Sequence, residues 1–250
     1  MPNNVTNMLT VSGEPETVKR FFAAINGGFF EDGKPMFIDF NKIKPMPEAL
    51  NVESGYRSNK ALELYVEFAK ESAGIADLSL ALGDKGADTI KRLSGNLTEK
   101  YTKITKDDPE LLIFGERLFD NIRNYGSPTW YEWCTANWGT KWNAYNQERL
   151  DDNTIVFDTA WAGIPGLMLE LSERFPDVLL SYKFGDEQWG FNTGELEFEG
   201  GECTFEHQPP DFSPDAKEIA EELFGEEAVF DDGDECDDEN EDDDDWGDEV

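Results

Sequence analysis

Basic residues are scarce in this sequence. It contains 21 Lys and Arg against 55 Asp and Glu in 250 residues, which gives a formal net charge of −34. A surface this negative repels nucleic acid and anionic membranes, and it attracts basic molecules over about one Debye length. The composition therefore argues against direct nucleic-acid binding by the surface as a whole and favours a basic partner.

Cysteines and long apolar runs are also scarce. The three cysteines, Cys134, Cys203 and Cys236, are far apart and form no CxxC pair, so the sequence predicts no disulfide framework. No apolar run approaches the roughly 20 residues that span a bilayer. The opening residues lack the basic and apolar regions of a signal peptide. We therefore expect a soluble protein of the reducing cytoplasm, with no membrane contact.

Familiar catalytic and cofactor motifs are absent as well. The sequence has no G-x-S-x-G, no Walker loop and no G-x-G-x-x-G. Its single histidine, His207, stands just before a Pro-Pro pair, and we expect it to be structural or to face solvent. Cys134 falls on the apolar stripe of a predicted helix and is expected to be an inert core thiol. The sequence therefore predicts no catalytic residue, no cofactor and no metal site.

Acidic charge is concentrated at the C-terminal end. Residues 226–250 hold 16 Asp and Glu and no Lys or Arg, which leaves −18 for the rest of the chain. Such low-complexity acid cannot bury enough apolar area to fold, so we predict a disordered tail. Closely spaced carboxylates approximate the charge of a nucleic-acid backbone, and an aromatic residue among them can anchor in a partner's pocket. The candidate partner-binding residues are Asp231, Asp232, Asp234, Asp237, Asp238, Asp242, Asp243, Asp244, Asp245 and Trp246.

The spacing of apolar residues predicts an α+β protein. Residues 5–12 alternate apolar and polar as a strand does, residues 14–27 have helical spacing, and residues 36–43 alternate again. From residue 127 onward the order is helix, strand, strand, helix, strand, strand, as in a split β-α-β, ferredoxin-like sandwich. We therefore predict a ferredoxin-like antiparallel sheet with helices on one face.

A helical segment interrupts this pattern. The predicted domains are a ferredoxin-like domain at 1–51 and 127–212, a helical insertion at 52–126, a short helix at 213–225 and the disordered tail at 226–250. Between Lys85 and Lys106 the insertion has six basic and two acidic residues. We expect a solvated helix face there, one that could also serve as a docking site for the chain's own tail, with a phosphate-facing surface as the alternative.

Aromatic residues are plentiful, at 13% of the chain, and gather in WCTANWGTKWNAY at 133–145. A helical spacing of apolar residues leads up to Gly139, which ends the predicted helix. We interpret the block as the corner where a helix turns into a strand over a core, since rings remove large apolar areas from water. The predicted structural aromatic core is Trp130, Trp133, Trp138, Trp142 and Trp161.

Three blocks of sequence, taken together, resemble a known family. They are DFNKIKPMP at 39–47, WYEWCTANWGTKWNA at 130–144 and TAWAGIPGLMLELSERFPDV at 159–178. In content and order they are similar to the YubB/Api-type family of plasmid- and phage-borne proteins of unknown function. The resemblance implies a ferredoxin-like domain and an origin on a mobile element. It implies no activity and no catalytic residue.

We therefore expect a non-enzymatic phage or plasmid accessory protein that acts in the host cytoplasm by protein–protein contact. The expected partner is a basic host protein, such as a defence or nucleic-acid enzyme, against which the acidic tail acts as a nucleic-acid mimic. The alternative for the tail is that it only keeps the chain soluble. The oligomeric state is left open.

Two other functions are compatible with the sequence. A small-ligand or nucleic-acid binder requires exposed rings on the sheet beside a basic residue. The candidates for that role are Trp142, Tyr145, Phe157 and Trp161, with Lys141 and Lys183 as the basic neighbours. An enzyme with a carboxylate-based site requires Asp39, Asp158 or Glu132 to converge in a pocket.

Overall fold

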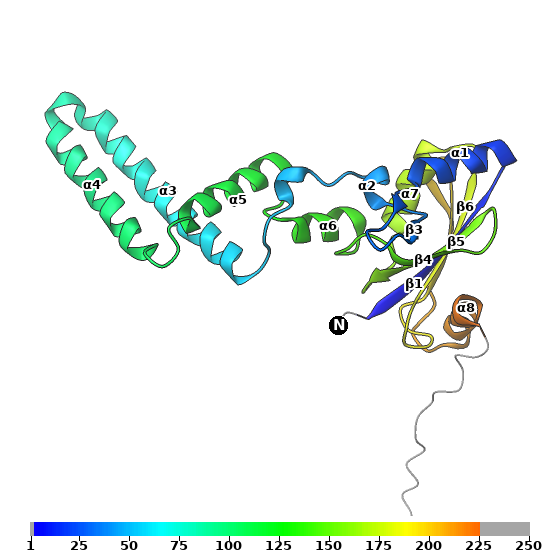
Figure 1. Ribbon diagram of the computed structural model, residues 1–250. Coiled ribbons are helices and arrows are strands. Elements are labelled where there is room, and N and C mark those ends of the chain that lie inside the picture. Colours follow the sequence, from blue (N-terminus) through cyan, green and yellow to red (C-terminus); the bar gives the residue numbers. More distant parts are fainter. Residues whose placement is uncertain (1–2, 226–250) are drawn as a thin grey trace, which may run out of the picture.

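The computed structural model describes residues 3–225, and it has two parts, a six-stranded sheet with its helices and a long helical arm (Figure 1). The predicted acidic tail and every candidate partner-binding residue from Asp231 to Trp246 lie outside the described residues. Within the described part, no helix combines the length and the hydropathy needed to span a membrane.

The sheet is antiparallel throughout, and its strand order is β4-β5-β1-β6-β7-β8. The first four strands of this order, with α1 following β1 and α7 following β5, make the ferredoxin-like split β-α-β. The predicted fold class is thus confirmed, and β7 and β8 extend the sheet beyond β6. The strands are β1 (Asn4–Ser12), β4 (Tyr145–Arg149), β5 (Thr154–Ala160), β6 (Leu179–Asp186), β7 (Gly194–Glu199) and β8 (Glu202–His207).

Helices α1 (Pro15–Ile25) and α7 (Pro165–Arg174) cover one face of the sheet (Figure 1). Each begins with a proline at its first position, where the missing N–H costs nothing. Their apolar stripes meet the inward-facing residues of β1, β5 and β6 in one core. Helix α8 (Pro214–Phe224), capped by the Ser213 hydroxyl, packs against β6 from the other face, where Lys183 forms an ion pair with Glu222.

The strand predicted at 36–43 is wrong. Asp39 Oδ1 accepts a hydrogen bond from Asn41 N at 2.9 Å, and this cap starts the short helix α2 (Phe40–Ile43), which buries Phe40 and Ile43. The sheet strand expected there is supplied by β4, about 100 residues later in the chain. Before α2 lies only the small hairpin of β2 (Gly28–Phe29) and β3 (Pro35–Met36), and after it the 3₁₀ turn η1 (Glu48–Leu50).

The arm consists of α3 (Tyr56–Leu82), the 3₁₀ turn η2 (Gly83–Gly86), α4 (Ala87–Ile104) and α5 (Leu111–Tyr125) (Figure 1). Helix α5 packs along the first half of α3, and α4 packs along its second half. Gly115 of α5 makes the closest approach, because a Cβ there would lie 2.1 Å from the Ala61 carbonyl oxygen. Helix α6 (Trp130–Trp138) returns the chain to the sheet and ends at Gly139 in a left-handed conformation.

Candidate binding site

The aromatic block of the sequence is divided between the core and the surface. Trp133 and Trp138 are buried in the sheet core, and Trp130 packs half-buried against it. The expectation that Trp142 and Trp161 belong to this core is wrong, since their side chains are 42% and 46% exposed. The reason is the irregular backbone that carries them. Residues 140–144 form no strand and Trp161 lies in the turn after β5, so no period-two alternation directs these rings inward.

Lys141 lies between the two exposed rings. Its ammonium nitrogen is 3.8 Å from the ring centroid of Trp142 and 3.9 Å from that of Trp161. The ring of Tyr145 stands edge-on to Trp142, with 6.3 Å between centroids. We call Lys141, Trp142 and Trp161 the Trp-Lys-Trp cluster.

Buried hydrogen bonds hold the turn that carries Trp161. The Thr159 hydroxyl donates to Ala162 O at 2.7 Å, and Ile164 N donates to the Tyr182 hydroxyl oxygen at 2.7 Å. The Tyr182 hydroxyl in turn donates to Asn7 Oδ1, in the centre of the core. Trp161 itself has φ +74°, a left-handed conformation that is strained for a bulky residue. The turn is therefore fixed from beneath by the sheet.

The segment that carries Lys141 and Trp142 is fixed in the same way. The Thr140 hydroxyl donates to Ala160 O at 2.9 Å and accepts from Ala160 N at 3.1 Å. Asn143 Nδ2 donates to Asp39 Oδ1 at 2.8 Å, and Asn143 Oδ1 accepts from Phe40 N at 2.9 Å. The two exposed rings thus sit on rigid supports.

A groove of about 290 Å³ runs beside the cluster, with Trp130, Cys134 and Trp138 in its lining and Trp142 among its outer residues. Burial raises the pKa of the Cys134 thiol to about 11. At neutral pH this thiol stays protonated and is a poor nucleophile. The groove therefore offers aromatic and apolar surface together with Lys141, Asn51 and Asn143, and its thiol is unreactive.

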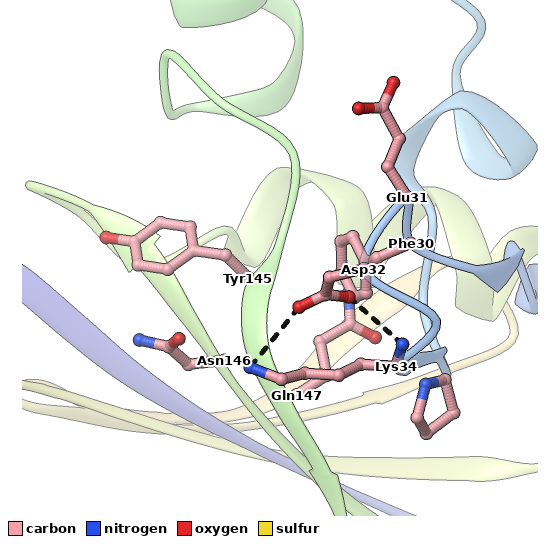
Figure 2. A pocket seen from close by; sticks show the side chains of 8 residues that line it. Phe30, Glu31, Asp32, Lys34, Tyr145, Asn146 and Gln147 are labelled. Carbon is pink, nitrogen blue, oxygen red and sulfur yellow. Dashed lines mark hydrogen bonds and ion pairs between the residues drawn. The ribbon is translucent and has the colours of Figure 1, made fainter.

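A larger cavity of about 590 Å³ lies between the β2–β3 hairpin and β4 (Figure 2). Asp32 folds back on its own hairpin, accepting from Lys34 N at 3.0 Å and pairing with Lys34 Nζ at 3.4 Å. Burial, with the nearby carboxylates of Asp158 and Glu187, raises the pKa of Tyr145 to about 12. The phenol stays protonated and donates to Asn4 Oδ1 at 2.7 Å. The cavity pairs no nucleophile with a base.

The carboxylates considered for an enzyme do not share a site. Asp39 caps α2 and accepts from Asn143, whereas Asp158 accepts from Thr6 Oγ1 and Asn146 Nδ2 at 2.9 Å each. Glu132 accepts from the Thr129 hydroxyl at the start of α6. In residues 3–225 no group of three or more His, Cys, Asp and Glu side chains is placed to hold a metal ion. His207 Nε2 lies 3.5 Å from Asp215 on the surface.

The remaining residues predicted for ring stacking are not available. Phe157 is fully buried, and Lys183 is held by Glu195 and Glu222. Of the predicted basic neighbours, only Lys141 lies at exposed rings. The sequence signal for the cluster was the Thr-Lys-Trp segment directly after Gly139, but its spatial partner, Trp161, is 20 residues away.

The sheet ends in an acidic edge. Residues 186–225, which include β7, β8 and α8, contain 12 Asp and Glu and a single Lys, Lys217. Within the described chain, β8 is hydrogen-bonded to β7 on one side and has no strand on the other. Five of its six residues are exposed, Phe205 among them. We call β7 and β8, with their glutamates, the acidic edge (Glu195, Glu197, Glu199, Glu202 and Glu206).

The basic stretch predicted between Lys85 and Lys106 lies mainly on α4. Lys100 Nζ of α4 pairs with Glu71 of α3 at 2.5 Å, and Lys103 Nζ pairs with Glu99 within α4 at 2.7 Å. These pairs neutralise part of the stretch within the arm itself. The solvated helix face expected from the sequence agrees with this arrangement.

Comparison with known proteins connects part of the chain to a family. Residues 137–247 match the family described as the ferredoxin-like domain in Api92-like protein, which confirms the resemblance to an Api-type family of unknown function over this part of the chain. The crystal structure of a protein api92 from Yersinia pseudotuberculosis aligns with 85% of this chain and 100% of its own, at 13% identity and a TM-score of 0.40. No curated protein matches the chain.

Proposed function

We propose that this protein works by binding a basic protein, and that the acidic edge is the surface that receives it. The observation that carries the proposal is the pairing of an open strand, β8, with a row of glutamates. An open edge supplies unpaired backbone N–H and C=O groups, and an extended peptide segment can add to it as a further strand. The glutamates then select a basic segment over others.

The charge of this edge also opposes self-association, to which open strands are prone. Edge strands pair with copies of themselves unless charges, prolines or coverage prevent it. Two copies of β8 would bring Glu202 and Glu206 against their own counterparts, which like-charge repulsion opposes. A segment rich in Lys or Arg meets no such barrier. The charge of the acidic edge therefore favours pairing with a basic segment and disfavours pairing with a second copy of β8.

Long-range attraction supports the same partner. The chain outside 226–250 has a charge of −18, and the tail that follows α8 in sequence adds 16 acidic residues. Such a field steers basic molecules toward the edge over about 10 Å at 0.1 M salt. As part of the proposal, the edge and the tail together occupy the basic surface of a host protein in the manner of a nucleic-acid mimic.

The direct test uses a fluorescent 12-residue peptide of alternating Lys and Val, with a Glu and Val peptide for comparison. Binding to the full chain is followed by anisotropy at two salt concentrations. We expect the Lys peptide to bind, more weakly at high salt, and the double variant Glu202→Lys, Glu206→Lys to lose about tenfold in affinity. The matched control, Glu63→Lys with Glu67→Lys on α3, makes the same charge change on the arm. An equal loss in the control would show that net charge alone attracts the peptide, and it would refute the acidic edge as the binding surface.

The contribution of the tail is measured with a chain that ends at Gly225. A basic nucleic-acid-binding protein loaded with labelled DNA is titrated with both chains, and the release of DNA is recorded. We expect the full chain to release DNA at a lower concentration than the shortened chain. Equal release by both chains, or release by neither, would exclude the tail as a mimic.

A further inference from the structure

We infer that the faces of Trp142 and Trp161 form a binding site for an organic cation, the arginine or lysine side chain of a basic partner, and that Lys141 occupies this site in the free protein. The inference rests on the proposed basic partner and adds a second point of contact. This site is separate from the acidic edge. It binds a single cationic side chain of the partner through aromatic rings, whereas the acidic edge binds an extended segment through β8 and its glutamates.

The geometry of Lys141 shows what the site accepts. The centroids of two rings that are 19 residues apart in sequence lie within 4 Å of one ammonium nitrogen. Aromatic faces carry negative potential, and a cation within about 6 Å of a ring centroid is attracted to it. Within residues 3–225, Lys141 forms no ion pair with a carboxylate, so the rings are the groups that hold its charge. The pair of tryptophans is already arranged around a cation.

The site is also accessible and rigid. Trp142 is 42% exposed and Trp161 is 46% exposed, so a ligand can reach both rings. Their backbones are fixed by the buried hydrogen bonds of Thr140 and Thr159, and Trp161 is kept in a left-handed conformation. Strain of this kind persists only where the surroundings enforce it, and it is concentrated at binding sites. A fixed aromatic pair needs little ordering when a ligand arrives.

Lys141 is a weak occupant. It reaches the rings on a flexible stem of four carbons, and its ammonium is a compact, strongly hydrated charge. A guanidinium is planar and less hydrated, so it stacks on aromatic faces more favourably. An arginine from a partner that is already held by its charge at the acidic edge can therefore displace Lys141. The loop that leads into β7 reaches the turn that carries Trp161, since Asn192 of the β6–β7 loop donates to Trp161 O at 3.3 Å.

If the ligand were an anion, removing the charge of Lys141 would have the opposite effect on affinity. If the cluster binds a carboxylate or phosphate, Lys141 is its main contact and the rings only flank it. Removing the charge of Lys141 would then weaken binding. In the cation site, the same change removes a competitor and strengthens binding. The sign of one substitution therefore separates the two ligand classes.

The experiment titrates the full chain with N-acetyl-arginine amide and, separately, with tetramethylammonium, and follows the tryptophan indole N–H signals by NMR. Lys141→Met keeps a flexible, unbranched side chain of nearly the same length and removes its charge. We expect it to bind both cations about two- to fivefold more tightly than the unmodified chain. Trp142→Ala and Trp161→Asn, in which Asn tolerates the left-handed conformation, should abolish the shifts. Lys19→Met, on α1, is the matched control for the loss of one positive charge and should leave the affinity unchanged.

Three results would overturn the inference. These are weaker cation binding by Lys141→Met, unchanged binding by the two tryptophan variants, or tighter binding by Lys19→Met equal to that of Lys141→Met. Inorganic phosphate is titrated in parallel, and shifts at the same indoles that vanish in Lys141→Met would assign the cluster to an anion instead. Thermal melts of each variant confirm that it is folded. The small cations do not depend on Glu202 and Glu206, so a failure here and a failure of the acidic edge are distinguishable.

Discussion

The sheet and the helical arm differ greatly in what they bury. The sheet core joins 27 buried residues, and besides β1, β5, β6 and both covering helices it includes residues of α2, α6, β7 and the loops between them. The cluster between α3 and α5 contains four, Val52, Ala61, Leu111 and Leu118. Farther out, the end of α3 leaves Leu78, Leu80 and Leu82 exposed. Since a helix pair with little burial opens locally at low cost, the two regions should differ in stability. The Trp-Lys-Trp cluster and the acidic edge both stand on the more stable one.

The largest expected effect is the loss of a ring from the sheet core. Phe157 is fully buried and stands edge-on to Phe40. Phe157→Ala should lower the free energy of unfolding by about 3–5 kcal/mol, because it removes apolar contacts and leaves a cavity. Every tryptophan lies outside the arm, so urea unfolding followed by tryptophan fluorescence reports on the sheet. Leu118→Ala, in the arm cluster, should leave this transition in place and alter only the helical signal in circular dichroism. A matching fall in the fluorescence transition would show that arm and sheet unfold as one unit.

A smaller effect is expected where the arm helices touch. Gly115→Ala places a Cβ 2.1 Å from the Ala61 carbonyl, so α3 and α5 must move apart. Overpacking of this kind costs about 1–3 kcal/mol. The control is Gly95→Ala in α4, where a Cβ meets nothing within 4 Å and helix propensity improves by about 1 kcal/mol. We expect amide exchange in the arm to accelerate in the first variant and to slow in the second. Equal exchange in both would mean that the two helices do not depend on this contact.

The buried hydrogen bonds beneath Trp161 give a third test, at about 1–2 kcal/mol. Tyr182→Phe leaves Asn7 Oδ1 and Ile164 N without their buried partner, which is costly because water cannot replace it. Both the urea midpoint of the sheet and the chemical shift of the Trp161 indole should change. Tyr125→Phe, on the exposed surface of the arm, should change neither. An unchanged Trp161 signal in Tyr182→Phe would mean that the buried hydrogen bonds of Tyr182 do not determine the position of Trp161.

Sequence patterns were a good guide wherever one periodicity ran through a whole element. The stripe Val18, Phe21, Phe22 and Ile25 is buried as its helical spacing predicts, and the alternation in β7 gives one strand of the sheet. The segment 36–43 misled because Asp39 can cap a helix as well as occupy a strand, and alternation over so few residues does not distinguish the two.

The candidate site was less predictable for a different reason. Trp142 and Trp161 are as apolar as Trp133 and Trp138, and composition alone assigns all four to the core. What separates them is the irregular backbone at 140–144 and after β5, which depends on hydrogen bonds such as Thr140 to Ala160 between distant segments. The role of Lys141 depends on the same contacts. Local sequence cannot encode a pairing of this range.

The smallest expected effect is a difference in acid sensitivity within the arm. Arg57 Nε donates to Asp108 Oδ2 at 2.8 Å and ties the start of α3 to the turn before α5, and this hydrogen bond lowers the pKa of Asp108. A carboxyl whose pKa is depressed by folding stabilises the fold above its unfolded pKa of about 4. That stabilisation is lost as the pH falls below 4 toward the folded pKa. Because the pair is partly exposed, the effect should be modest and weaker in high salt.

Amide exchange at the start of α3 should accelerate between about pH 4 and pH 2.5, relative to a folded reference peptide in β1. Asp108→Asn should show faster exchange already at pH 6 and little further change on acidification. An acid response in that variant equal to the one in the unmodified chain would assign the effect to the neighbouring Glu53, which also pairs with Arg57.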